Sequence, residues 1–494
     1  MEYISTRDKT VKVSAATAIA NGISSDGGLF VPDDFPELNA KDFETLCKLS
    51  YIDRARYILK LFLNDFTDDE IKYCVKGAYS GSFDDDKPAP LKAIGDNINI
   101  LELWHGPTCA FKDLALQLLP FLLTTSAKKV SSGKKTVILV ATSGDTGKAA
   151  LEGFKDVKDT EIIVFYPSEG VSPMQKLQMD SQMGENVHVC AIKGNFDDAQ
   201  SAVKKIFTDS TVKEKLKNNN MEFSSANSIN WGRLAPQIIY YISAYCDLLK
   251  DGTDLSKGFN VTVPTGNFGN ILAAFYAKKM GVPINKLICA SNSNNVLTDF
   301  IKTGIYDRNR KFYTTISPSM DILISSNLER MLFYLCGNDD NYVASLQKQL
   351  SENGRFEIKS EVKEKLQELF YGGFCDDAET LNTIKDTFSN YNYLCDTHTA
   401  VAVNVYRKYL KETGDNRPVV IASTASPYKF AKSVLSAVSD KTSDSEFETV
   451  RLLSTVTDTV IPKPIAKLEN AKVRFNTVVN KEDMYKAVFD SLGI

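Results

Sequence analysis

The sequence predicts an α/β protein in which mostly parallel sheets are covered by helices on both faces. After about residue 90, short runs rich in β-branched residues alternate with amphipathic helical periods, a pattern typical of that fold class. The chain has 494 residues, which is too long for one hydrophobic core and sufficient for two or three domains. The predicted strands are 98–103, 136–141, 161–166, 186–192, 259–264, 286–291 and 418–424.

The same pattern divides the chain into three parts. Residues 1–90 are predicted to form a mainly helical N-terminal region, because amphipathic stretches precede a proline-bearing loop. Residues 91–225 are predicted to form a smaller α/β domain, and residues 226–494 a larger one. The larger domain contains a charged helical insertion at about 329–392, where we find no convincing strand. Residues 473–494 have the pattern of a strand and a closing helix.

Composition excludes several classes of protein. Lys and Arg number 58 against 62 Asp and Glu, so there is no basic surplus for a nucleic-acid partner. No stretch approaches the ~20 apolar residues of a membrane span, and the N-terminus lacks an apolar core, so we expect a cytoplasmic protein without a membrane partner. The nine cysteines and three histidines show no CxxC or HExxH spacing, so we expect neither disulfides nor a metal site.

The loop after strand 259–264 is the first candidate for a binding site, because ligands of open α/β sheets bind beyond the carboxyl ends of the strands. Backbone N–H groups at a glycine-bearing helix start form an anion site together with the helix dipole. A phosphate fits such a loop, and so does a tight turn with no ligand. The residues of this loop are Gly266, Asn267, Phe268, Gly269 and Asn270.

A second loop joins strand 136–141 to a helix. Its hydroxyl and N–H donors suit a carboxylate or a phosphate, although Ser, Asp and Thr are also ordinary helix caps. Neither loop has a GxGxxG pattern and this one lacks the P-loop pattern, so dinucleotides and nucleoside triphosphates are disfavoured. The residues of this second loop are Ser143, Gly144, Asp145, Thr146 and Gly147.

Two further residues complete the candidate site. Lys112 follows Phe111 and precedes an apolar helical run, where burial would desolvate the ammonium and lower its pKa, as Schiff-base formation requires. An exposed lysine with its stem over apolar neighbours fits the same pattern. Thr424 ends the last predicted strand, so its hydroxyl could bond a ring nitrogen or cap the next helix. Together, the lysine, the two anion loops and this hydroxyl favour one cofactor site.

At these positions the sequence resembles the fold-type II pyridoxal-phosphate enzymes, and among them the threonine synthases. Ordered motifs of this number are far more specific than any one of them. The resemblance implies two open, mostly parallel sheets wrapped by helices, as in the tryptophan synthase β-like fold, with pyridoxal 5'-phosphate as cofactor. It says nothing about residues 329–392. The motifs are YISTRD with DGGLFVP, HGPTCAFKD, ATSGDTG, PTGNFGN, SPSMDILISSNLER and STASPYKF.

The resemblance also implies residue roles. Lys112 would be the Schiff-base lysine, which then serves as general base and acid. Thr424 would be the partner of the pyridine nitrogen. Asp145 stands where many relatives have Asn, and this favours the threonine synthase branch. The cofactor phosphate would be held by Gly266, Asn267, Phe268, Gly269 and Asn270, and the substrate carboxylate by Ser143, Gly144, Asp145 and Thr146.

The implied activity is that of a carbon–oxygen lyase acting on phosphates. O-phosphohomoserine and water would give threonine and phosphate by γ-elimination and β-hydration, the last step of threonine biosynthesis. Another fold-type II enzyme, such as a threonine or serine dehydratase or a β-replacement synthase, would share the lysine and the phosphate loop. A catalytically inactive, threonine synthase-like binding protein is a third possibility. The sequence leaves monomer and homodimer open.

The substrate phosphate would need donors of its own. We expect them among Ser172, Lys176, Asn230 and Arg233, because these residues combine charge or polarity with helix-start positions. Lys176 and Arg233 fit a surface or a structural ion pair as well.

Overall fold

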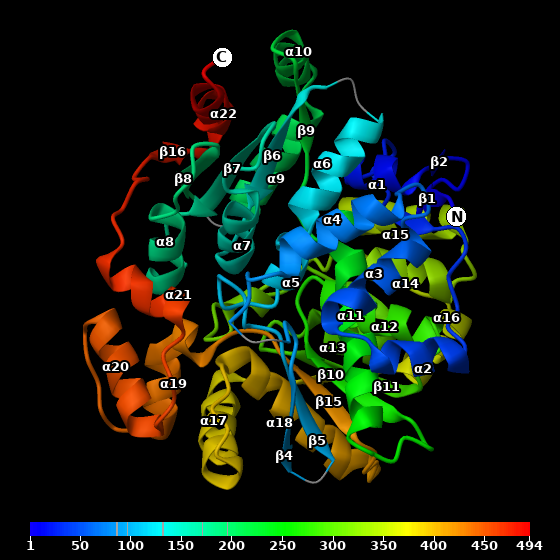
Figure 1. The fold of residues 1–494 in the computed structure, drawn as a ribbon, viewed down its shortest axis with the longest axis vertical. Coiled ribbons are helices and arrows are strands. Elements are labelled where there is room, and N and C mark those ends of the chain that lie inside the picture. Colours follow the sequence, from blue (N-terminus) through cyan, green and yellow to red (C-terminus); the bar gives the residue numbers. More distant parts are fainter. Residues whose placement is uncertain (85–86, 96, 131–132, 170, 195) are drawn as a thin grey trace.

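Two sheets of mainly parallel strands, each covered by helices, make up most of the molecule, as Figure 1 shows. The computed structural model describes residues 1–494 except 85, 86, 96, 131, 132, 170 and 195. No described helix is long and apolar enough to cross a membrane. The predicted fold class is confirmed, and all seven predicted strands are present as β5 (Ile98–Glu102), β6 (Lys135–Ala141), β7 (Thr160–Pro167), β8 (Val187–Lys193), β10 (Phe259–Pro264), β11 (Ile284–Ser291) and β15 (Val419–Ser423).

The smaller sheet has five parallel strands in the order β16-β8-β7-β6-β9. Its central strands β6 and β7 are almost entirely buried, because helices cover both faces. The remaining elements of this part are β9 (Met221–Ser224), β16 (Val478–Asn480), α5 (Asp113–Leu116), α6 (Leu119–Val130), α7 (Asp145–Phe154), α8 (Pro173–Asp180), α9 (Phe196–Thr208), α10 (Ser210–Asn218) and α22 (Met484–Leu492), with the 3-10 turn η4 (Lys481–Asp483).

The larger sheet has six strands in the order β14-β11-β10-β15-β5-β4, and only β4 (Leu91–Gly95) runs antiparallel to its neighbour. Strands β10 and β15 are adjacent and parallel, so their carboxyl ends share one edge of the sheet. The loops that follow them, at residues 265–268 and at Thr424, are therefore brought together. The helices around this sheet include α11 (Trp231–Lys250), α12 (Gly269–Lys279), α13 (Val296–Thr303) and α18 (Thr397–Thr413).

The sheets exchange segments that the predicted ranges 91–225 and 226–494 had kept apart. Strand β5 comes early in the chain but pairs with β15 of the larger sheet, with Ile100 opposite Ile421. Conversely, β16 lies within the range predicted for the larger domain but pairs with β8 of the smaller sheet. The predicted strand and helix at the chain end are β16 and α22. Between β15 and β16 the chain runs through η2 (Pro427–Phe430), α19 (Ala431–Val438), α20 (Glu446–Thr457), α21 (Lys463–Ala466) and η3 (Lys467–Asn470).

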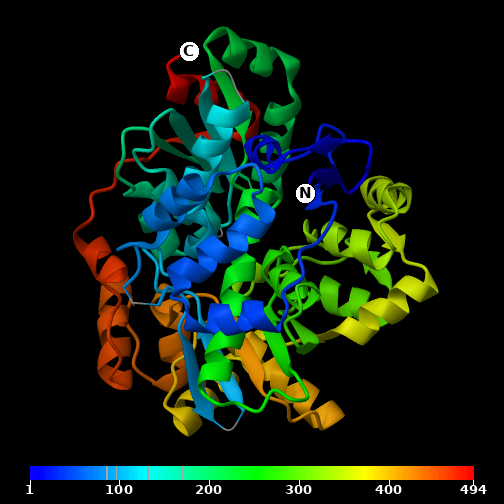
Figure 2. The same ribbon diagram turned by 45° about the vertical axis from the view of Figure 1, so that its right-hand side comes forward.

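The N-terminal region contains a small antiparallel sheet, β2-β1-β3, as well as helices. Arg7 forms a bidentate ion pair with Glu329 of the larger part, and this pair links the N-terminal segment to that part. Figure 2 shows the N-terminal segment, in dark blue, beside helices of the larger part in yellow-green. The predicted boundary loop includes residues 85 and 86, which lie outside the described residues. The elements are β1 (Tyr3–Ser5), β2 (Lys12–Val13), β3 (Phe30–Pro32), α1 (Ala15–Asn21), α2 (Ala40–Lys48), α3 (Tyr51–Phe62) and α4 (Asp68–Tyr79).

The region 329–392 was wrongly predicted to contain no strand. Strand β14 (Phe370–Phe374) extends the larger sheet by pairing in parallel with β11. Its sequence, FYGGF, contains two glycines, which weaken any strand pattern. In the structure, a Cβ on Gly372 would lie 3.1 Å from the Cα of Thr298, so the glycine allows α13 to approach. The other elements from this side of the molecule are β12 (Ile305–Asp307), η1 (Pro318–Met320), α14 (Leu328–Leu335), α15 (Asp340–Asn353), β13 (Arg355–Glu357), α16 (Ser360–Leu369) and α17 (Asp377–Tyr391).

Candidate active site

A cleft of about 960 Å³ is lined by the loops that follow strands of both sheets. This arrangement agrees with the rule that open α/β sheets bind ligands beyond the carboxyl ends of their strands. The predicted site residues that line it are Lys112, Ser143, Thr146, Arg233, Gly266, Asn267, Phe268, Gly269, Asn270 and Thr424. The predicted residues outside its lining are Gly144, Asp145, Ser172, Lys176 and Asn230.

Lys112 stands at the start of the short helix α5, and its side chain is only 12% exposed. The turn before it is held by Asp113, whose carboxylate accepts hydrogen bonds from the N–H and the hydroxyl of Thr108 at 2.9 and 2.6 Å. The N–H of Phe111 donates to the carbonyl oxygen of Thr424 at 2.8 Å. This bond joins the lysine turn to the end of β15, so Lys112 and Thr424 lie on adjacent segments.

The loop after β10 turns at Phe268, which has a φ of 63° and caps helix α12. A non-glycine residue in this left-handed region is uncommon and costs energy, but it helps to direct successive N–H groups toward one anion. The Phe268 ring is buried and lies 5.6 Å from the ring of Phe370 on β14. The amide nitrogen of Asn270 is buried without a hydrogen-bond partner among the described residues. A ligand acceptor in the cleft would satisfy such a donor.

The loop after β6 is shaped by Thr142, whose Oγ1 accepts hydrogen bonds from the N–H groups of Gly144 and Gly147 at 3.0 and 2.9 Å. Ser143 and Thr146 line the cleft. Asp145 is instead engaged by protein groups: its carboxylate accepts a hydrogen bond from Gln175 at 2.8 Å and belongs to a buried ion pair. Ser143 and Thr146 therefore face the cleft, whereas Asp145 lies outside its lining and is held by Gln175 and Lys429.

Burial of Lys112 favours its neutral amine, and the charged groups around it act in both directions. Burial, with the positive charges of Arg233 and Lys429, lowers the pKa of Lys112 to about 8 against the opposing charge of Asp145. Burial opposes ionisation of Asp145, but Lys429 and Lys112 hold the pKa of that carboxyl well below its usual range. An amine with a pKa near 8 has a useful neutral fraction at neutral pH, which nucleophilic attack on an aldehyde requires.

Of the four residues predicted for the substrate phosphate, Arg233 is the one that reaches the cleft. It is 5% exposed, one guanidinium nitrogen donates to the carbonyl of Ala226 at 2.9 Å, and its Nε has no partner among the described residues. Burial lowers the pKa of Arg233 to about 10. Asn230 caps α11, Ser172 caps α8, and Lys176 is exposed on α8. Arg233 is thus a buried cation with a donor to offer an anion.

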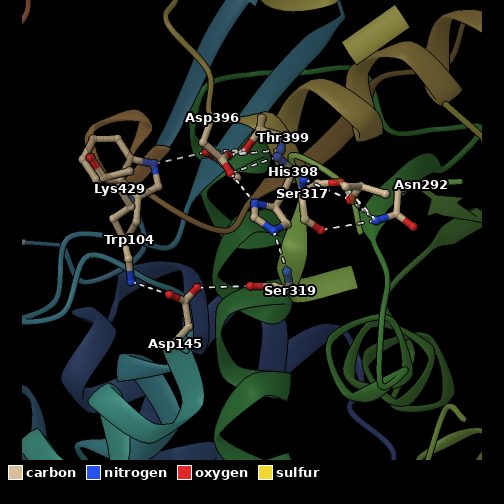
Figure 3. A network of polar contacts seen from close by, with 12 residues as sticks. Trp104, Asp145, Asn292, Ser317, Ser319, Asp396, His398, Thr399 and Lys429 are labelled. Atoms are coloured by element: carbon tan, nitrogen blue, oxygen red, sulfur yellow. Dashed lines mark hydrogen bonds and ion pairs between the residues drawn. The ribbon is translucent and has the colours of Figure 1, made fainter. Parts of the chain in front are cut away.

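Sequence reasoning missed three residues of the polar network drawn in Figure 3: Lys429, His398 and Ser319. The Lys429 ammonium lies 2.6 Å from Asp145, and the Ser319 hydroxyl donates to the same carboxylate at 3.3 Å. His398 lines the cleft and accepts a hydrogen bond from the N–H of Ser319. Ser319 lies in the SPSMD motif and Lys429 in the SPYKF motif. Both are polar residues to which the resemblance assigned no role, and this was the signal by which they could have been found.

Among the residues that the structure describes, no group of three or more His, Cys, Asp or Glu side chains could hold a metal ion.

Three family models match the chain in order. Threonine synthase N terminus matches residues 2–79, Pyridoxal-phosphate dependent enzyme matches 87–424, and Threonine synthase, C-terminal, matches 399–488. With its two helix-covered sheets and a lysine buried between their loops, the chain is a pyridoxal-phosphate-dependent enzyme by class. Within that class, it belongs to the threonine synthase family.

Similar proteins carry two kinds of name. Threonine synthase-like 1 of Homo sapiens is 43% identical over 461 residues, which cover 89% of this chain and 61% of that protein. The chain thus spans about three fifths of that relative. Threonine synthase of Saccharomyces cerevisiae is 38% identical over 504 residues, covering 96% of this chain and 95% of that protein.

Solved structures of the family cover the whole chain. The X-ray structure of PLP-bound threonine synthase from Brucella melitensis has a TM-score of 0.87 at 35% identity and covers 99% of both chains. Threonine synthase from yeast has a TM-score of 0.87 at 34% identity, covering 100% of this chain and 99% of that one.

Proposed function

We propose that this chain is a threonine synthase that converts O-phosphohomoserine and water into threonine and phosphate with pyridoxal 5'-phosphate. The observation that carries the proposal is one cleft that contains the largely buried Lys112 and two separate groups of donors suited to an anion, the 266–270 loop and Arg233. The proposed reaction has two phosphate groups to hold, one on the cofactor and one on the substrate. A threonine or serine dehydratase would need only the first.

The residues of the cleft fit pyridoxal phosphate. The unpaired Nδ2 of Asn270 and the left-handed turn at Phe268 provide N–H donors for its phosphate. Gly266 allows the loop to pass close to the backbone of Ser319, because a Cβ on residue 266 would lie 2.8 Å from the carbonyl oxygen of Ser319. Thr424, 6% exposed at the end of β15, would supply the hydroxyl for the ring nitrogen. Lys112 would bond the aldehyde carbon.

When bound, the cofactor supplies an electron sink for the carbanions of the reaction. Lys112 is the residue of this chain suited to take the proton from the substrate Cα, since its amine is largely desolvated. It would also move the later protons, because its amine lines the cleft and has a lowered pKa. Ser143 and Thr146 would hold the substrate carboxylate through their hydroxyls and backbone N–H groups.

Arg233 would hold the phosphate that leaves the substrate. A guanidinium is a bidentate partner for phosphate, and a buried one is worth more than an exposed one because water screens it less. Arg233 and Lys112 line the same cleft, and the positive charge of Arg233 contributes to the lowered pKa of Lys112.

A second candidate function is that of a catalytically inactive, threonine synthase-like protein that binds a phosphorylated small molecule. The observation behind it is the name of the relatives: threonine synthase-like 1 proteins reach 43% identity, against 38% for the yeast threonine synthase. The presence of Lys112 and of the complete 266–270 loop favours a catalytic function. A protein that only binds a ligand has no need for an amine with a lowered pKa.

The visible spectrum of the purified full-length chain, with and without borohydride, followed by peptide mapping, tests the cofactor assignment. We expect one reduced adduct, on Lys112. Phosphate and threonine formed from O-phosphohomoserine are then measured against keto acid formed from threonine. Formation of keto acid alone would indicate a dehydratase. A bound cofactor with no turnover of either substrate, where Lys112→Ala behaves like the parent protein, would indicate the inactive binding protein.

A further inference from the structure

The carboxylate of Asp145 lies between the side-chain nitrogens of two lysines. Its Oδ1 is 2.6 Å from Nζ of Lys429, and its Oδ2 is 3.8 Å from Nζ of Lys112. The side chain of Lys429 is fully buried and also donates to the carbonyl of Thr108 at 3.1 Å. Asp145 thus has one oxygen committed to Lys429 and the other directed toward the lysine of the cleft.

Neutral groups fix the same orientation. Gln175 donates to Oδ1 of Asp145 at 2.8 Å, and the hydroxyl of Ser319 donates to Oδ2 at 3.3 Å. Each carboxylate oxygen therefore has one neutral and one cationic partner, and the four partners come from four different segments of the chain. The carboxylate is held in one orientation, with Oδ2 on the side of Lys112.

An isolated carboxylate at this place would work against the proposed chemistry. A negative charge within about 4 Å of an amine stabilises its protonated form, whereas attack on an aldehyde needs the neutral form. The charged groups that act on Lys112 are Asp145 and Asp113, which favour the ammonium, and Arg233 and Lys429, which oppose it. Lys429 is the one of these cations in contact with Asp145.

We propose that Lys429 is a positioning residue that offsets the charge of Asp145, so that Asp145 orients the amine of Lys112 without holding it as an ammonium ion. The inference rests on the proposed function in taking Lys112 as the nucleophile. It also explains how an aspartate is tolerated at this position, because the Asp145–Lys429 pair has no net charge.

The test is the pH dependence of the reaction of Lys112 with trace acetic anhydride in the full-length chain freed of cofactor, read from the Lys112 peptide by mass spectrometry. In the parent protein, half-maximal labelling is expected near pH 8. Lys429→Met should move this midpoint up by about one pH unit, and Asp145→Asn should move it down by a similar amount. The double variant, which removes both charges, should return it close to the parent value. Lys148→Met is the matched control, since Lys148 is a buried lysine of α7 that pairs with Glu152 at 3.0 Å.

An unchanged midpoint in Lys429→Met, or a double variant that fails to restore it, would overturn the proposal and leave Lys429 a purely structural residue. If Lys429→Met does not fold, the downward shift in Asp145→Asn and its reversal in the double variant decide the question. The labelling needs no substrate. A protein that shows these shifts but makes no threonine would therefore refute the proposed function alone, and an active enzyme without the shifts would refute only the role of Lys429.

Discussion

The imidazole Nε2 of His398 accepts a hydrogen bond from the backbone N–H of Ser319 at 3.1 Å, while Nδ1 lies 2.7 Å from the carboxylate of Asp396. Because Nε2 accepts, the ring proton is assigned to Nδ1, and Asp396 fixes this tautomer. Ser319 in turn touches both halves of the site, through its hydroxyl bond to Asp145 and through the close approach of its carbonyl to Gly266. His398 therefore holds the turn at Ser319 that packs against Gly266 of the proposed cofactor loop, residues 266–270. Figure 3 shows the contact between His398 and Ser319.

Replacing His398 by Leu should loosen this turn. The partly buried N–H of Ser319 would lose its acceptor, and we expect a loss of about 1 kcal/mol in the free energy of unfolding together with weaker cofactor binding. His398→Gln keeps an acceptor oxygen near the same place and should retain most of both. Urea unfolding and a cofactor titration by absorbance measure the two effects. Equal cofactor affinity in the Leu variant and the parent would contradict the role of His398.

The two glycines of the cofactor loop should respond differently to alanine. A Cβ at Gly266 would meet the carbonyl oxygen of Ser319 at 2.8 Å, so backbone must shift. A Cβ at Gly269 would meet only side-chain atoms, the nearest being the amide nitrogen of Asn327 at 3.5 Å, which is ordinary van der Waals contact. We expect Gly266→Ala to lower the affinity for pyridoxal phosphate at least tenfold and Gly269→Ala to retain the parent melting temperature. A spectrophotometric titration and thermal unfolding of both variants provide the comparison. A Gly266→Ala variant that binds the cofactor normally would show that the loop is not constrained by Ser319.

Phe370 on β14 should support the cofactor loop from behind. Its ring is 2% exposed and contacts the ring of Phe268, which occupies the left-handed position of the loop. Phe370→Ala should cost about 3–5 kcal/mol of stability by creating a cavity, and should weaken cofactor binding. Phe374, at the other end of the same strand, is 41% exposed, so Phe374→Ala serves as the control. The prediction fails if the two variants bind cofactor and unfold alike.

Arg233 should govern the Michaelis constant for the phosphorylated substrate. Loss of a charged hydrogen bond of about 1.5–3 kcal/mol corresponds to a rise of about ten- to hundredfold in KM for O-phosphohomoserine in Arg233→Gln. Arg233→Lys, which keeps the charge, should show a smaller rise. Lys176→Gln is the control, because Lys176 is exposed on α8 and outside the cleft. Steady-state kinetics with a check of the melting temperature would settle the assignment, and an unchanged KM in Arg233→Gln would remove this residue from the substrate site.

Local patterns predicted most of the parallel sheets. All seven strands predicted from runs of β-branched residues are present. They could be recognised because strands buried on both faces have continuous apolar sequences. Strand β14 was not predicted because two of its five residues are glycines, which have a low strand propensity. One of them, Gly372, allows α13 to pack closely against the strand. The exchange of β5 and β16 between the sheets also escaped, since strand pairing over hundreds of residues depends on packing and leaves no local pattern.

For the site, the sequence by itself determined which residue types are available: Lys112 at a helix start, and the glycine loop and Thr424 at strand ends. Tertiary structure decided how they are charged and oriented. Lys112 was open to interpretation as an exposed lysine until burial and the cations of Arg233 and Lys429 defined its environment. Asp145 was expected among the substrate contacts, yet it is turned toward Lys429, a partner 284 residues away along the chain. The physical reason is that burial and opposite charge act through space, so the state of an ionisable group depends on neighbours that only folding brings together.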